Sequence, residues 1–77
     1  MITPEQIQQL ILAQLPGSRV RVEDMMGTGD HFEVTVESPA FAGKSLMDQH
    51  IMIFTILKGE MDSRIHALQL KTKVLAV

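Results

Sequence analysis

The residues of this sequence best suited to chemistry are its three histidines, His31, His50 and His66. Neutral imidazole is a borderline ligand that suits iron, and in Rieske-type clusters two histidines replace two cysteines on one iron. Because the chain has no cysteine, any iron–sulfur chemistry has to take its sulfur from a partner. The histidines show neither H-x-x-x-H nor H-E-x-x-H spacing, so the sequence predicts no self-contained zinc or di-iron site.

Catalysis by this chain is not indicated. General acid–base and nucleophilic catalysis both need a positioned base beside a nucleophile or a second titratable group. The serines and histidines form no motif such as G-x-S-x-G, and 77 residues leave little room for a pocket that encloses a ligand. We therefore expect a protein that is not an enzyme.

Length and composition predict a single domain over residues 1–77 that has enough apolar material, 45% of its residues, for one core. The formal net charge of −2 does not favour a polyanion binder, although residues 41–77 are mildly basic. No basic segment followed by an apolar run opens the chain, and no apolar run approaches the ~20 residues that span a bilayer. We expect a soluble protein without membrane contact, located in the cytoplasm or in an organelle of reducing character.

The first half of the chain predicts a helix followed by a β-hairpin. Thr3 can cap a helix, and Gln6 stands where a capping box requires it. The apolar residues Ile7, Leu10, Ile11 and Leu15 then fall on one helical face, and Pro16-Gly17 ends the helix. Residues 19–23 and 32–37 alternate between polar and apolar, and the turn at residues 27–30 joins them as two antiparallel strands.

The second half predicts another helix and a last strand. Ser45 begins a helix over residues 45–57, Gly59 is a natural stop, and residues 60–63 add a short turn. Residues 65–70 form the final strand, with His66, Leu68 and Leu70 on one face. The order α-β-β-α-β predicts a small α+β domain: a three-stranded mixed sheet with the helices packed on one face.

The second predicted helix is apolar on more than one side. Its apolar side chains are Ile51, Met52, Ile53, Phe54, Ile56 and Leu57. A core position accounts for Phe54, Leu57 and part of the rest, but not for all of them. Some therefore belong to an exposed apolar patch, which commonly marks an interaction surface.

Three segments resemble motifs of the BolA-like family. Gly29-Asp30-His31-Phe32-Glu33-Val34 resembles its hairpin loop, Phe41-Ala42-Gly43-Lys44-Ser45-Leu46 with Gln49-His50 its F-x-G-K-x-L … H segment, and Ile65-His66-Ala67-Leu68-Gln69-Leu70-Lys71-Thr72 its terminal I-H-A-x-x-x-K-T strand. The segments occur in family order and spacing and cover nearly the whole chain. The resemblance implies a class II KH-like fold, in agreement with the order of elements above.

The resemblance also implies a function. BolA-like proteins pair with monothiol glutaredoxins, and the pair can share a glutathione-ligated 2Fe–2S cluster in iron–sulfur trafficking or in iron and redox regulation; alone, the chain would hold no cofactor. On this basis His66 is the main protein ligand and His31 the second. Without the resemblance, both histidines would be interpreted as solvated side chains. The expected partner-binding residues are Gly43, Lys44, His50, Ile51 and Lys71.

The chain departs from the family pattern in two places. The family ending T-P-x-x-W is replaced by Lys73-Val74-Leu75-Ala76-Val77, so partner contacts made by a last helix are not expected here. The position after His50 is often arginine in the family, whereas here it is Ile51. A further partner surface, or a homodimer, would explain the unusually apolar second helix.

A DNA-binding transcriptional regulator is the alternative function. KH domains clamp nucleic acid with a G-x-x-G loop, and Gly43-Lys44-Ser45-Leu46 keeps only the first glycine. The DNA contacts would then be Lys44, Lys58, Lys71 and Lys73 on the KH-like face. A merely solvated set of lysines is the favoured interpretation of these residues.

Overall fold

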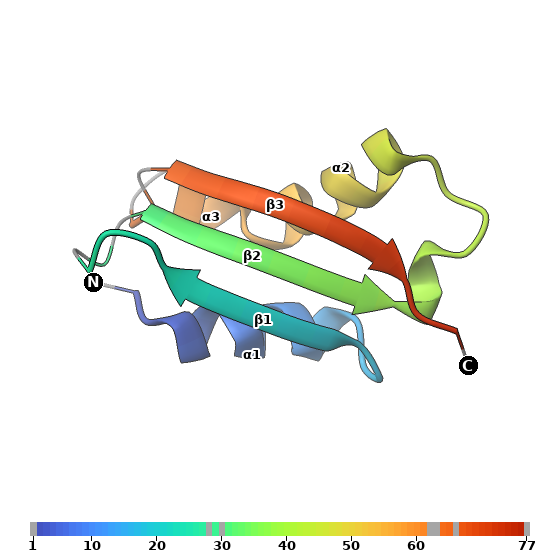
Figure 1. The fold of residues 1–77 in the computed structure, drawn as a ribbon, viewed down its shortest axis with the longest axis horizontal. Helices are drawn as coiled ribbons and strands as arrows, with labels where there is room; N and C mark the ends of the chain where they lie inside the picture. Colours follow the sequence, from blue (N-terminus) through green and yellow to red (C-terminus); the bar gives the residue numbers. More distant parts are fainter. Residues whose placement is uncertain (1, 28, 30, 62–63, 66, 77) are drawn as a thin grey trace.

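The computed structural model describes residues 2–27, 29, 31–61, 64–65 and 67–76. These form one sheet with helices on one side (Figure 1). The elements are α1 (Pro4–Gln14), β1 (Arg19–Asp24), β2 (His31–Ser38), the 3-10 helix η1 (Pro39–Phe41), α2 (Leu46–Ile56), α3 (Lys58–Met61) and β3 (Ala67–Val74). The expected α-β-β-α-β order is confirmed, with η1 and α3 as short additions.

The sheet is mixed, as expected, and β2 is its central strand. β1 pairs antiparallel with β2 through the hairpin, and β3 pairs parallel with β2. A parallel pair cannot be joined by a tight turn. The chain therefore returns through η1, α2 and α3, and Figure 1 shows the last two running back behind β3.

Side-chain hydroxyls fix the starts of both long helices. The Thr3 hydroxyl accepts a hydrogen bond from the Gln6 N–H (3.1 Å), and the Gln6 side chain accepts one from the Thr3 N–H (2.9 Å), which completes the predicted capping box. The Ser45 hydroxyl accepts from the Asp48 N–H at 3.1 Å. Both predicted helix starts are thus confirmed.

The core lies between the helices and one face of the sheet. The central strand alternates strictly, so that Phe32, Val34 and Val36 are fully buried while the residues between them face the open side. The other core residues are Ile2, Ile7, Ile11, Leu15, Phe41, Ile53, Leu57 and Ile65. At the outer edge of β1, Gln8 of α1 donates from Nε2 to the Val20 carbonyl at 3.1 Å.

Two predicted boundaries in the second half are wrong. The last strand covers Ala67–Val74 rather than residues 65–70, because it pairs with all eight residues of β2. Gly59 does not end a helix: α2 ends at Ile56 with the buried Leu57 as its C-cap, and Gly59 lies inside α3. That short helix is held by the N–H groups of Glu60 and Met61, which both donate to the Leu57 carbonyl.

Two side chains assigned to helical core faces are partly exposed. Leu10 of α1 is 36% exposed, and Phe54 of α2 is 37% exposed. The core is contacted instead by Ile53 of α2 and by Leu57, the C-cap of that helix, which are both fully buried. Neighbouring helix positions differ by about 100° around the axis, so Phe54 cannot share the direction of Ile53.

None of the described helices is long and apolar enough to cross a membrane. Leu68 and Leu70 of β3 are half-buried and pack against the core, as expected. His66, which was placed on the same strand face, lies outside the described residues.

The same substitution, made separately at two isoleucines of α2, tests the burial assigned to each of them. Ile53 is fully buried and Ile51 is 53% exposed. We expect Ile53→Ala to lower the free energy of unfolding by about 2–5 kcal/mol, and Ile51→Ala to change it by less than about 1 kcal/mol. Urea denaturation followed by circular dichroism measures both. If Ile53→Ala does not fold, Ile53→Val and Ile51→Val make the same comparison, and equal losses would show that the burial is misassigned.

Candidate functional site

His31 is the first residue of β2 and lies at one end of the sheet. It is half-buried and alternates with the buried Phe32, so it faces the open side. On one flank, the Met25 N–H donates to the His31 carbonyl at 2.9 Å. On the other flank, His31 is paired in register with Ala67 of β3. The histidine is therefore fixed through its backbone by both neighbouring segments.

A hollow of about 130 Å³ adjoins His31. It is lined by Met25 and Met26 from the hairpin, His31 and Phe32 from β2, and residues 67–69 of β3. The two methionines are 49% and 65% exposed. They bring soft, polarizable thioethers beside the imidazole. The hollow is smaller than the ~300–1,000 Å³ of ordinary ligand pockets, so it suits a side chain of a partner better than a substrate.

The predicted ligand pair is only partly visible in the structure. His66 lies outside the described residues, but Ala67, to which it is bonded, is the residue paired with His31. Sequence reasoning identified His31 and missed Met25 and Met26. The available clue was their position directly before the hairpin turn, where the chain must cross to His31.

Gly43 and Lys44 lie at the opposite end of the sheet from His31. They follow η1, which continues directly from the end of β2, and the eight residues of β2 separate the two ends by about 23 Å. The Lys44 carbonyl accepts from Nε2 of the buried Gln49 at 3.0 Å. Gly43 has a φ of 76°, a left-handed turn conformation that favours glycine.

The other predicted partner-binding residues occupy two further places. His50 is half-buried on α2, and Ile51 is exposed on the same helix. Lys71 is exposed on the open face of β3, where its Nζ lies 3.9 Å from Glu33 Oε1. The structure therefore groups His50 and Ile51, but it does not join Lys71 to them or any of the three to His31.

The lysines proposed for DNA contact do not gather on one surface. Lys44 lies in the connection before α2, Lys58 begins α3, and Lys71 and Lys73 lie on β3. On the open sheet face, Lys71 contacts Glu33 and Lys73 is paired in register with Glu37. The Glu33 carboxylate offsets Lys71, and Glu37 is the cross-strand neighbour of Lys73, so the described residues offer no continuous basic strip for a phosphate backbone.

Comparison with known proteins identifies the family. The model of the family described as BolA-like protein matches residues 14–76. The chain belongs to the BolA-like family. A solved BolA homologue from Coxiella burnetii is 40% identical, with a TM-score of 0.79 over 96% of this chain and 92% of that one.

Two further relatives bear on the function of this BolA-like chain. The BolA domain of SufE1 from Arabidopsis thaliana is 32% identical, with a TM-score of 0.82 over 92% of this chain and 89% of that one. The Escherichia coli protein named DNA-binding transcriptional regulator BolA is 37% identical over 46 residues, which is 60% of this chain and 44% of that protein.

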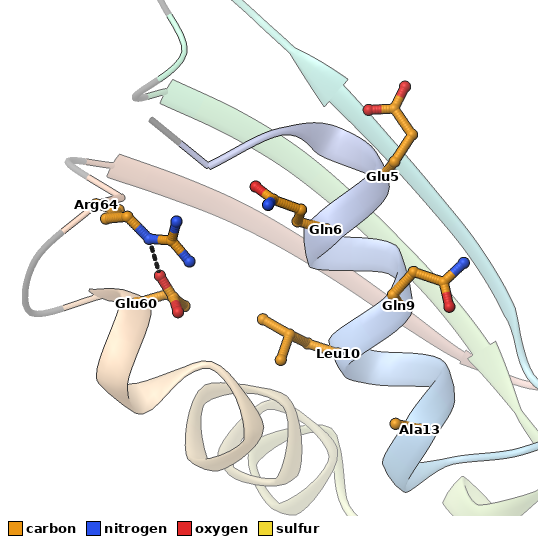
Figure 2. A pocket seen from close by; sticks show the side chains of 7 residues that line it. All are labelled: Glu5, Gln6, Gln9, Leu10, Ala13, Glu60 and Arg64. Carbon is orange, nitrogen blue, oxygen red and sulfur yellow. Dashed lines mark hydrogen bonds and ion pairs between the residues drawn. The ribbon is translucent and has the colours of Figure 1, made fainter.

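A larger, shallow hollow of about 520 Å³ lies between α1 and α3 of this BolA-like chain, and no predicted site residue that the structure describes lines it. Figure 2 shows Leu10 of α1 pointing toward the gap, across from Glu60 and Arg64. The hydrogen bond from Arg64 lowers the pKa of Glu60, and the same bond raises the pKa of Arg64. Both groups stay charged near neutral pH, so neither is suited to exchange a proton with a substrate.

The Glu60–Arg64 pair gives a prediction with a defined sign. A lowered carboxyl pKa in the folded state means that the pair stabilises the fold above the unfolded pKa of Glu60, and that this stabilisation is lost as the pH falls through the folded pKa. We expect Arg64→Met to raise the pKa of Glu60 toward its ordinary value, measured by carbon NMR of the carboxyl group. Arg21→Met, which removes an arginine paired with Glu23, should leave the pKa of Glu60 unchanged. An unchanged pKa in Arg64→Met would contradict the assigned cause.

Proposed function

We propose that this BolA-like protein is an adaptor, without catalytic activity of its own, that binds a monothiol glutaredoxin and supplies histidine ligands to a shared 2Fe–2S cluster. Glutathione and the glutaredoxin supply the sulfur ligands. The observation that carries the proposal is the register of the sheet, in which His31 is paired with Ala67, the residue bonded to His66. His31 thus begins the central strand, and His66 directly precedes, in the sequence, the first residue of the strand paired beside it.

The residues at this end fit such a role chemically. Imidazole nitrogen is a known replacement for thiolate in 2Fe–2S clusters, and the chain contributes no thiolate because it has no cysteine. When bound, the cluster supplies the redox chemistry. His31 is held at the rim by a backbone hydrogen bond on one flank and by strand pairing on the other, which fixes the point from which its side chain projects. Met25 and Met26 form a soft, largely apolar wall that limits access of water.

The approach of a partner is sterically favoured at this end. His31 faces the open side of the sheet, the helices lie behind it (Figure 1), and the methionine side chains project beside it. The partner therefore meets exposed thioethers, which adapt their shape to a contact surface. SufE1 contains a BolA domain similar to this chain, so a BolA-like domain can act as one part of a larger protein.

DNA binding is the weaker alternative for this chain. The name of the Escherichia coli relative supports it, but the four lysines are divided among three places and two of them face glutamates. If DNA binding does occur, it should fall steeply with salt and be weakened by joint substitution of Lys71 and Lys73. A salt-insensitive or absent gel shift would remove the alternative.

The three histidines provide the ligand test and its control. We expect a cluster-bearing, glutathione-loaded monothiol glutaredoxin to give a new visible absorption and circular dichroism spectrum when the wild-type chain is added. His66→Ala should abolish the new spectrum, and His31→Ala should weaken or shift it. His50→Ala, at an expected partner-binding residue of α2 that is not a proposed ligand, should give the wild-type spectrum once the glutaredoxin is saturating. A wild-type spectrum in His66→Ala would show that the ligand assignment is wrong.

Substitution of two exposed methionines distinguishes a glutaredoxin surface beside His31 from one on α2. Met26 beside His31 is 65% exposed, and Met47 on α2 is 72% exposed. We expect Met26→Lys to weaken glutaredoxin binding, measured calorimetrically, by about 5- to 10-fold, which is typical for loss of an apolar interface contact. Met47→Lys should leave the affinity unchanged. The reverse result would move the glutaredoxin surface to α2, as the resemblance first implied.

A further inference from the structure

Helix α2 has apolar side chains on its outer side, where a surface helix of a monomeric protein is normally polar. Its inner face, with Ile53 and Leu57, is fully buried. Its outer side carries Leu46 at 62%, Met47 at 72%, Ile51 at 53% and Phe54 at 37% exposure. A helix with apolar residues on nearly all sides is normally buried on nearly all sides. The outer side of α2 therefore has the composition of an interface.

The spacing of these residues indicates what kind of surface would cover them. Met47, Ile51 and Phe54 follow one another at intervals of four and three residues, which places them in one line along the helix. This is the spacing by which one helix packs along another. We call Met47, Ile51 and Phe54 the α2 stripe. None of its residues lines either of the hollows described above.

The charges next to the α2 stripe indicate whether a second α2 would pack parallel or antiparallel to the first. Asp48 lies in the first turn of α2 and Lys58 lies just beyond its end, and both are exposed. Neither takes part in an ion pair among the described residues. If two α2 helices pack antiparallel, Asp48 of one copy meets Lys58 of the other at both ends. A parallel pair would instead place Asp48 against Asp48.

We propose that the α2 stripe is a self-association surface, on which a second copy of this chain packs its own α2 antiparallel about a two-fold axis. Such an interface is isologous, so every contact is made twice. Ile51 of each copy lies against Phe54 of the other near the axis, and the Asp48–Lys58 pairs lie at the two ends. The stripe thus meets an apolar surface of the second copy, and the charges beside it are complementary to their own copies.

The size of the surface sets the strength of this association. The exposed apolar residues of α2 form a patch on the order of the 300–600 Å² found as the largest patch on ordinary monomers. Standard stable interfaces bury about 800 Å² per partner. The dimer is therefore weak and concentration-dependent. It goes beyond the proposed cluster role, and it leaves the His31 end of each copy uncovered.

Sedimentation equilibrium between about 10 µM and 1 mM tests the proposal. We expect the apparent mass of the wild type to rise from the monomer value of 8.6 kDa toward twice that value. Met47→Lys should stay monomeric throughout, whereas Met26→Lys should associate like the wild type. For glutaredoxin binding the expectation is reversed: Met26→Lys weakens it and Met47→Lys does not. Failure of one proposal is therefore distinguishable from failure of the other.

Exchange of charges tests the antiparallel arrangement. Asp48→Lys and Lys58→Asp should each weaken association by roughly 2- to 30-fold, the range for two exposed ion pairs. The double variant should regain the wild-type affinity, because the two charges are exchanged across the interface. Thermal unfolding by circular dichroism checks that each variant keeps its fold.

Several results would overturn the proposal. They are a wild type that stays monomeric at 1 mM, and a Met47→Lys variant that associates like the wild type. Loss of association in Met26→Lys would place the contact at the hairpin instead. A double charge variant no better than the single variants would exclude the antiparallel arrangement. If the wild type stays monomeric and Met47→Lys no longer binds glutaredoxin, the stripe is the surface for that partner instead.

Discussion

The parallel pairing of β3 with β2 is the interaction on which the rest of the structure depends. It extends over all eight residues of the central strand, from His31 beside Ala67 to Ser38 beside Val74. Two parallel neighbours require a crossover, and this places α2 and α3 against the same sheet face as α1. The same register joins His31, the first residue of β2, to Ala67, the residue that follows His66 in the sequence. One set of backbone hydrogen bonds thus determines both the layer of helices and the candidate ligand site.

Local sequence patterns predicted most of the fold, because its helices begin and its strands alternate for local reasons. Thr3 and Ser45 cap their helices as expected, and Phe32 begins the strict alternation of the central strand. The errors arise where tertiary pairing overrides local preference. The last strand continues past residue 70 because β2 continues beside it. Gly59 lies within a helical turn because the N–H groups of Glu60 and Met61, which follow it, donate to the carbonyl of the buried Leu57.

The candidate site was less predictable than the fold. The family resemblance singled out His31, whereas the position directly before the hairpin turn was the one clue that Met25 and Met26 share a hollow with it, because thioethers have no characteristic spacing. The lysines illustrate the opposite case. Lys71 and Lys73 are close to each other in sequence, but the register places glutamates of β2 beside them. Charge in a sequence can be counted, whereas its neutralisation depends on cross-strand neighbours that only the sheet reveals.

The hydrogen bond from Gln8 to the Val20 carbonyl has a consequence for the behaviour of the chain at high concentration. An outer strand offers unpaired backbone groups on which strands of other molecules can add, and this leads to aggregation or fibrils. Gln8 occupies one of the acceptors that such a strand would need at the edge of β1. The other edge is β3, which carries the exposed Lys71 and Lys73. An incoming strand would have to pack against these charged side chains, which disfavours its addition. A concentrated solution can thus favour ordered helix pairing while extension of the sheet into a fibril is resisted at both edges.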